Sequence, residues 1–251
     1  MNTGENKALA IRVTSTGLPL GTTVTKGCTE LAVGEVCNIT VTPGKIASLN
    51  KISGKSCTTV VAPTPGVITI KATNSAAVKR GVLVLGYGCI YQGGFVYSIN
   101  DTVTTKKPNT LSIRGNVLSP NKASIFPGKS WNQAKLICAN LPVPPKTPKW
   151  SLPTICNMAP SIAASFSPRL TAACSLNKQQ ISKTLPFLIA DSGMNNCTRG
   201  SYCFGGPYWS STSANENMTS AGFAIFEKSG SWGEPTMVQG GFYGVRCSRP
   251  F

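Results

Sequence analysis

Hydrophobic and polar residues alternate in short stretches along the first third of the chain. Residues 8–14 alternate, and runs rich in β-branched residues follow at 36–41, 58–62 and 66–72. Gly and Pro residues suited to turns separate these runs. Short strands divided by regular turns are typical of a β-sandwich. We therefore predict an all-β sandwich, with an immunoglobulin-like arrangement, over residues 1–85.

The pattern changes near residue 86, where a Gly-rich stretch begins. Apolar residues recur at helical spacing over 129–139, and Ser130 can cap that helix. A weaker helix signal starts at Thr154. Two short strands are expected at residues 223–227 and 243–247. A second domain of mixed helix and strand is therefore predicted over residues 86–251.

The number and spacing of the Cys residues indicate whether the protein folds in a reducing or an oxidising environment. The chain contains ten Cys and no His. Zinc and iron–sulfur sites need clustered spacings such as C-x-x-C, which this sequence lacks. An even number of Cys without metal spacing is typical of disulfides formed in an oxidising environment. We therefore expect a secreted or cell-surface protein whose Cys are all paired and which holds no metal or other cofactor. No apolar run is long enough to predict a membrane span.

The formal net charge is +16, and the basic excess is localised. No acidic residue lies between Asp101 and Asp191. A surface of one sign repels itself, and it usually binds or steers a partner of opposite charge; solubility is the alternative reason. The candidate polyanion-binding residues are basic residues of this stretch: Lys106, Lys107, Arg114, Lys122, Lys129, Lys135, Lys146, Lys149, Lys178 and Lys183.

The residues argue against catalysis. Without His the chain cannot build a His-based triad or an imidazole general base. Asp and Glu total eight, and nothing near them in the sequence suggests a pair of catalytic carboxylates. We predict no catalytic residues and no enzymatic activity. The sequence also lacks any nucleic-acid-binding motif, so nucleic acid is not an expected partner.

Four motifs stand in a fixed order between residues 131 and 249. They are Trp131-x-x-Ala134 followed by Cys138, Trp150-Ser-Leu-Pro-Thr154, Tyr208-Trp-Ser-Ser-Thr212 and Val245-Arg-Cys-x-Arg249. Together they resemble the C-terminal domain of the Legionella collagen-like adhesin and its bacterial relatives. The resemblance implies a lectin-like α+β fold with an irregular antiparallel sheet, similar to C-type lectins and formylglycine-generating-enzyme-like domains. It also implies binding of sulfated glycosaminoglycans by an adhesin involved in virulence.

A second resemblance concerns the first domain and its Cys. The segment from Cys28 to Pro43 resembles bacterial immunoglobulin-like surface domains, which implies a local disulfide between Cys28 and Cys37. The lectin-like resemblance implies a disulfide between Cys138 and Cys247. The remaining pairs are hypotheses, because sequence does not fix connectivity. They are Cys156 with Cys174, Cys197 with Cys203, and Cys57 with Cys89.

These observations lead to two alternative functions. The first is host interaction through sulfated or other anionic polysaccharides of the host or matrix. The second is a structural or protein-binding role in a bacterial surface assembly, with a host surface protein as a possible partner. The resemblance also allows a homotrimer, because the adhesin domain ends a three-stranded collagen-like stalk. This chain has no Gly-X-Y repeat that would require one.

A thiol titration tests the prediction that every Cys is paired. Under denaturing, non-reducing conditions we expect a reading near zero thiols per chain, because an oxidising compartment favours disulfides. A reading of two or more free thiols would contradict the assignment of compartment.

Overall fold

The structure is a computed structural model that describes residues 1–49, 62–100, 114–120, 128–158, 174, 180–185, 206–213, 221–226, 235–236 and 243–251. In these ranges antiparallel strands predominate, with three helices. The chain divides into two compact units, with the change between Ile90 and Tyr91. No helix within the described ranges is long and apolar enough to cross a membrane.

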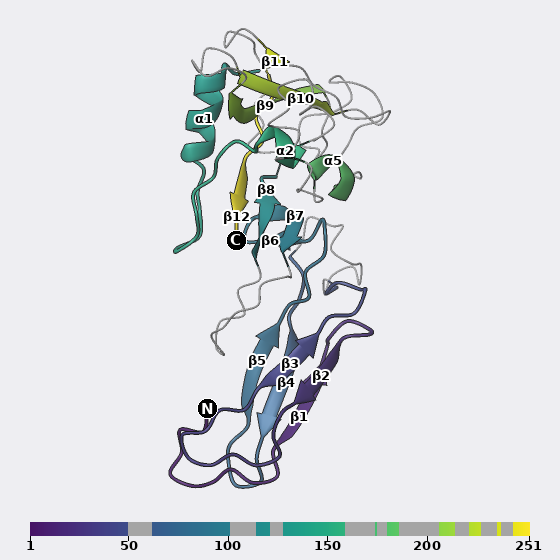
Figure 1. The fold of residues 1–251 in the computed structure, drawn as a ribbon, viewed down its shortest axis with the longest axis vertical. Coiled ribbons are helices and arrows are strands. Elements are labelled where there is room, and N and C mark those ends of the chain that lie inside the picture. The colour runs from purple at the N-terminus through teal and green to yellow at the C-terminus, as the bar shows by residue number, and fades with distance from the viewer. Residues whose placement is uncertain are drawn as a thin grey trace. The chain divides into compact units, whose positions relative to one another are not determined.

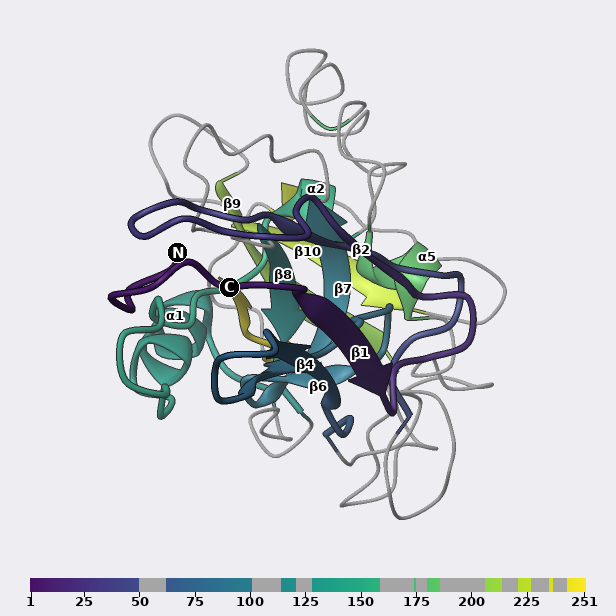
Figure 2. The same cartoon turned by 90° about the horizontal axis from the view of Figure 1, so that it is seen from below.

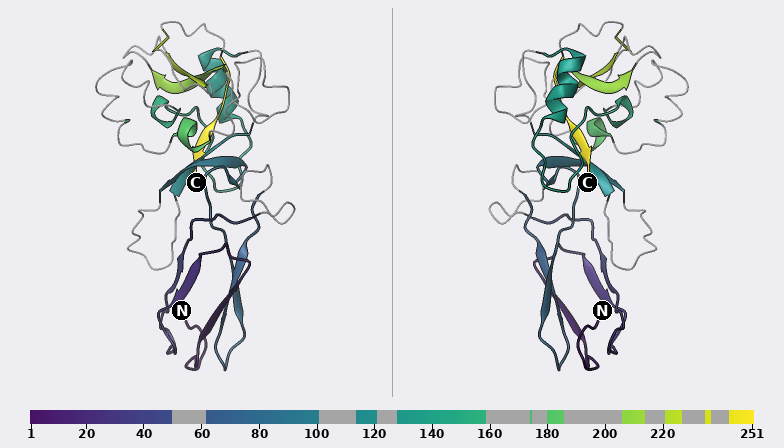
Figure 3. Two further views of the ribbon diagram at one scale, coloured as in Figure 1. Left: turned by 90° about the vertical axis from the view of Figure 1, so that its right-hand side faces the viewer. Right: turned by 90° about the vertical axis from the view of Figure 1, so that its left-hand side faces the viewer.

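The first unit contains a three-stranded sheet and a two-stranded ribbon. The sheet has the order β1 (Arg12–Thr16), β4 (Gly66–Lys71), β5 (Val78–Val82), and the ribbon pairs β2 (Thr23–Lys26) with β3 (Ile39–Thr42). Figure 3 shows the sheet and the ribbon as two layers. Largely β structure was predicted for this part of the chain, and the structure confirms it.

The first strand lies further along the chain than its alternating pattern indicated. It was predicted at 8–14, but β1 begins at Arg12, and Ala8 forms only an isolated bridge with Leu31. The N-terminal segment therefore pairs with residues near Cys28 before it enters the sheet. Residues 58–61 of another predicted strand lie outside the described residues.

A small apolar core holds the first unit. Ile11, Leu31 and Ala72 are buried together, and the disulfide between Cys28 and Cys37 packs against them. Small domains bury little apolar surface, so a covalent link in such a core contributes a large share of stability.

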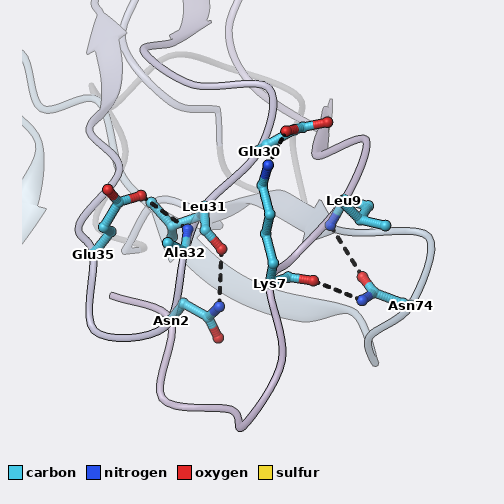
Figure 4. Close-up of polar contacts among 8 residues, drawn as sticks. All are labelled: Asn2, Lys7, Leu9, Glu30, Leu31, Ala32, Glu35 and Asn74. Atoms are coloured by element: carbon cyan, nitrogen blue, oxygen red, sulfur yellow. Dashed lines mark hydrogen bonds and ion pairs between the residues drawn. The ribbon is translucent and has the colours of Figure 1, made fainter.

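Polar contacts hold the N-terminal segment of the first unit in place (Figure 4). The Asn74 side chain accepts from Leu9 N and donates to the Lys7 carbonyl, which ties the loop after β4 to this segment. Lys7 Nζ lies 2.5 Å from a Glu30 carboxylate oxygen, in an exposed ion pair. Exposed pairs of this kind contribute little to stability, so the backbone pairing is the stronger constraint.

Two sheets and three short or medium helices make up the described part of the second unit. The four-stranded sheet has the order β12 (Ser248–Pro250), β8 (Arg114–Leu118), β7 (Gly94–Asn100), β6 (Ile90–Tyr91). The other sheet has the order β11 (Pro235–Thr236), β10 (Ala221–Phe226), β9 (Gly206–Ser213). The helices are α1 (Trp131–Ala139), α2 (Ile155–Met158) and α5 (Ile181–Thr184).

Helix α1 confirms the helix predicted at 129–139. Ser130 is its N-cap and accepts a hydrogen bond from Gln133 N, while the Gln133 side chain accepts from Ser130 N. This capping box satisfies two donors that the first turn leaves unpaired. Trp131, Ala134 and Cys138 are buried on one face, as the apolar periodicity indicated.

The final strand was placed too early by its pattern. Residues 243–247 were predicted as a strand, but β12 covers Ser248–Pro250. Tyr243 and Gly244 instead form isolated bridges to Lys129 and Tyr208. The segment pairs with several distant parts of the chain in turn, so its own alternation could not show where a continuous ladder begins.

Three disulfides are present among the described residues: Cys28–Cys37, Cys138–Cys247 and Cys156–Cys174. Cys89 is buried and disulfide-bonded. Cys57, Cys197 and Cys203 lie outside the described residues. No cysteine among the described residues is free.

The disulfides of the two units should differ in their contribution to stability. Cys138 and Cys247 are 109 residues apart and Cys28 and Cys37 are nine apart, which the chain-entropy account converts to about 4.7 and about 2.5 kcal/mol. We expect Cys138→Ala with Cys247→Ala to lower the urea midpoint of the second unit more than Cys28→Ala with Cys37→Ala lowers that of the first. Equal losses, or a reversed order, would contradict this ranking.

Candidate anion-binding surface

The described part of the second unit presents basic side chains and no Asp or Glu. Arg114, Lys135, Lys146, Lys149 and Lys183 are exposed, and Lys129 is half-buried. The acidic residues of this unit all fall outside the described residues, as do the candidate residues Lys106, Lys107, Lys122 and Lys178. The described surface of this unit therefore carries side-chain charge of one sign.

Lys135 projects from α1 beside an aromatic ring. Its Nζ lies 3.9 Å from the centroid of the Trp131 ring, and the Trp131 Nε1 donates to the Ser210 carbonyl at 2.8 Å. The ring is buried and fixed by that hydrogen bond, so it orients the lysine by a cation–π contact. Lys135 is thus held against the surface of α1.

Lys129 precedes the N-cap of α1 and has a rigid backbone. Its N–H donates to the Tyr243 carbonyl at 2.9 Å, and its carbonyl accepts from the Trp209 indole. Trp209 is fully buried, with the Tyr243 ring 4.6 Å away between centroids. The backbone of Lys129 therefore lies at the edge of an aromatic core.

The candidate basic residues that the structure describes do not all lie on one face. Figures 1 and 2 show α1 and α5 on opposite sides of the sheet that contains β8 and β7. Lys135 lies on α1 and Lys183 on α5, so a compact ligand could not contact both. The structure thus separates residues that the sequence pattern had grouped.

Lys146 and Lys149 share one exposed loop, residues 142–149, which follows α1. This segment runs beside β12 (Figure 1), and Ser151, two residues after it, exchanges backbone hydrogen bonds with Ser248 at 2.9 and 2.7 Å. The loop also contains Pro142, Pro144, Pro145 and Pro148. Among the described candidate residues, these two lysines are the closest together in the chain.

The base of the loop is fixed by Trp150. The Trp150 Nε1 donates to the Pro142 carbonyl at 3.1 Å and so closes the loop across eight residues. The Arg249 guanidinium lies 4.8 Å from the centroid of the Trp150 ring. On another side, a Cβ at Gly94 would lie 2.9 Å from Trp150 Cη2, so only Gly leaves room for this ring. Trp150 is buried by these contacts.

Arg249 also fixes the turn between β6 and β7. Its Nη1 donates to Gln92 Oε1 at 3.1 Å, and its Nη2 donates to the Gln92 carbonyl. Gln92 and Gly93 both have positive φ, 47° and 84°, as in the two-residue turns that favour hairpins. Arg249 therefore links the hairpin turn to the base of the loop 142–149. From the sequence, Arg249 had been predicted only as a member of the C-terminal motif.

Arg246 is fully buried and structural. Its Nη1 donates to the Ser119 carbonyl at 2.9 Å. Burial lowers the pKa of this guanidinium, and the Tyr208 hydroxyl opposes the shift by accepting a hydrogen bond from it. An internal cation with such partners stabilises the packing of the C-terminal segment and is not accessible to a ligand.

Comparisons with protein-family models, with curated proteins and with solved structures found no match for the chain. Membership of the adhesin family therefore stays a prediction.

Substitution of Arg249 by Lys tests how much the contacts of Arg249 with Gln92 and Trp150 stabilise the fold. A lysine keeps the charge but cannot reach both Gln92 oxygens and stack on Trp150, so we expect the free energy of unfolding to fall by about 2 kcal/mol. Arg114→Lys is the matched control, because Arg114 is exposed at the start of β8, and it should change stability by under about 0.5 kcal/mol. Equal effects of the two substitutions on the free energy of urea unfolding would show that the contacts of Arg249 with Gln92 and Trp150 do not stabilise the fold.

Proposed function

We propose that this chain is a secreted or surface-exposed binding protein that recognises sulfated or otherwise anionic polysaccharides through its second unit. We infer that this unit has a lectin-like fold and that the first unit is immunoglobulin-like. The proposal includes neither catalysis nor a cofactor. The observation that carries it is the exposed surface of the second unit, whose described residues supply basic side chains and no carboxylate side chain.

The separation of the basic groups favours a polymer over a compact ligand. Lysines on opposite sides of a unit cannot surround one small anion, but a long polyanion passes from one group to the next. Each lysine that contacts a sulfate or carboxylate also releases condensed counterions, so affinity falls steeply with salt. Adhesion to a polysaccharide needs only such distributed, moderate contacts.

The disulfides support maturation outside the reducing cytosol. Both units contain disulfides. Cys28–Cys37 links segments in the core of the first unit, and Cys138–Cys247 does so in the second. Disulfides persist mainly in secreted, periplasmic or cell-surface proteins. An extracellular polysaccharide is a partner that such a protein can meet.

A specific observation favours a second function, binding to a protein partner. Two large apolar side chains of the first unit lie three residues apart in the loop that the Cys28–Cys37 disulfide closes, and both are exposed, with Val33 at 55% and Val36 at 48% of their accessible surface. Exposed apolar residues near one another are typical of protein interfaces. The alternative is therefore a component of a surface assembly, or an adhesin for a host surface protein, with no glycan ligand.

A heparin column with a salt gradient tests the proposal. We expect retention at low salt and complete elution by about 0.5 M salt, because distributed ionic contacts are screened. Neutral dextran on the same matrix is the control and should retain nothing. Passage through heparin at low salt would refute polyanion binding, and retention that persists unchanged above this salt would indicate a neutral ligand or a protein partner instead.

A further inference from the structure

The loop 142–149 contains a tight turn with an unusual residue at its third position. Thr147 N donates to the Pro144 carbonyl at 3.2 Å, which closes a turn over residues 144–147. Lys146, the third residue, has a φ of 63°. Turns with positive φ at this position usually have Gly or Asn there, because a Cβ atom is strained in this conformation and Asn offsets the strain by local hydrogen bonding. Lys146 is therefore a strained residue in an exposed turn.

The rest of the loop is built to keep this conformation. Pro145, before Lys146, fixes its own φ at the value that such a turn needs. The Thr147 hydroxyl adds a second hydrogen bond to the Pro144 carbonyl, at 2.6 Å. At the base, Trp150 binds the Pro142 carbonyl and is held by Arg249. The loop is thus rigid at both its tip and its base.

Rigidity and charge together point to ligand contact. Strained backbone conformations that the surroundings enforce are typical of functional positions. A lysine on a rigid turn loses less conformational freedom on binding than a lysine on a mobile loop, so more of its ionic attraction appears as affinity. Lys149, also exposed, stands at the other end of the same turn-containing segment, next to the buried Trp150.

We propose that the loop 142–149 is the principal contact of the second unit for an anionic polysaccharide, with Lys146 and Lys149 each contacting a sulfate or carboxylate group. Trp150 is a positioning residue that holds the loop for them. The inference rests on the proposed function and selects two lysines from the candidate set. Lys135 and Lys183 then belong to secondary contacts of a longer polymer.

Lys146→Gly separates binding from folding. Gly adopts positive φ without strain, so the variant should unfold at the same temperature as the wild type or a higher one. Its affinity for a heparin octasaccharide at low salt should fall by about fivefold, and the slope of log affinity against log salt should flatten by about one. Lys146→Arg keeps the charge and should bind like the wild type.

Matched variants test whether the loss of octasaccharide affinity is specific to the loop 142–149. Lys149→Ala should weaken octasaccharide binding to a similar extent, whereas Lys183→Ala, which removes an exposed lysine on the other side of the unit, should stay within about twofold of the wild type. Titration calorimetry with the octasaccharide measures all of these affinities.

The outcomes separate the two levels of the proposal. If the wild type binds and Lys146→Gly with Lys149→Ala binds equally well, the loop assignment is wrong and the polyanion function survives. If the wild type shows no binding at low salt, the function itself is wrong. A lower unfolding temperature of Lys146→Gly would show that Lys146 is not strained and would remove the argument for this loop.

Discussion

The disulfide between Cys138 and Cys247 joins the buried face of α1 to the segment that leads into β12, and the described part of the second unit is arranged around that link. Cys247 also exchanges hydrogen bonds with Ser119 at the end of β8. One residue later, Ser248 bonds to Tyr97 and pairs with Ser151. A short C-terminal segment thus contacts a helix, two strands and Ser151, which follows the loop 142–149. A displaced register in this segment would disturb all of these contacts.

Charge is used in two different ways in this unit. Arg246 and Arg249 are fully buried, and their guanidinium groups bind carbonyl, amide and hydroxyl oxygens inside the fold. Buried cations are costly unless hydrogen-bonded, so these contacts fix one packing arrangement. The lysines remain on the surface. Through Trp150, the internal cation Arg249 determines where the loop of Lys146 and Lys149 stands, which connects core packing to the proposed binding function.

Local signals in the sequence predicted local structure well. The capping box at Ser130 and the apolar periodicity located α1 within two residues, because both act within a few residues of chain. Nonlocal pairing was not predictable, and β12 begins after the predicted strand for that reason. Counting charges identified a basic stretch but could not show that α1, which carries Lys135, and α5, which carries Lys183, lie on opposite sides of the sheet. Nor does a sequence show that Lys146 has positive φ, although two adjacent prolines favour a turn there.

Lysine acylation footprinting, read by mass spectrometry with and without a heparin octasaccharide, shows directly whether the loop 142–149 contacts the polyanion. We expect the bound octasaccharide to shield Lys146 and Lys149 strongly and to leave Lys183 as reactive as in the free protein. The lysines of the first unit, such as Lys71 and Lys79, serve as internal references. Equal reactivity of Lys146 and Lys149 in the presence and absence of bound octasaccharide would contradict the proposed contact.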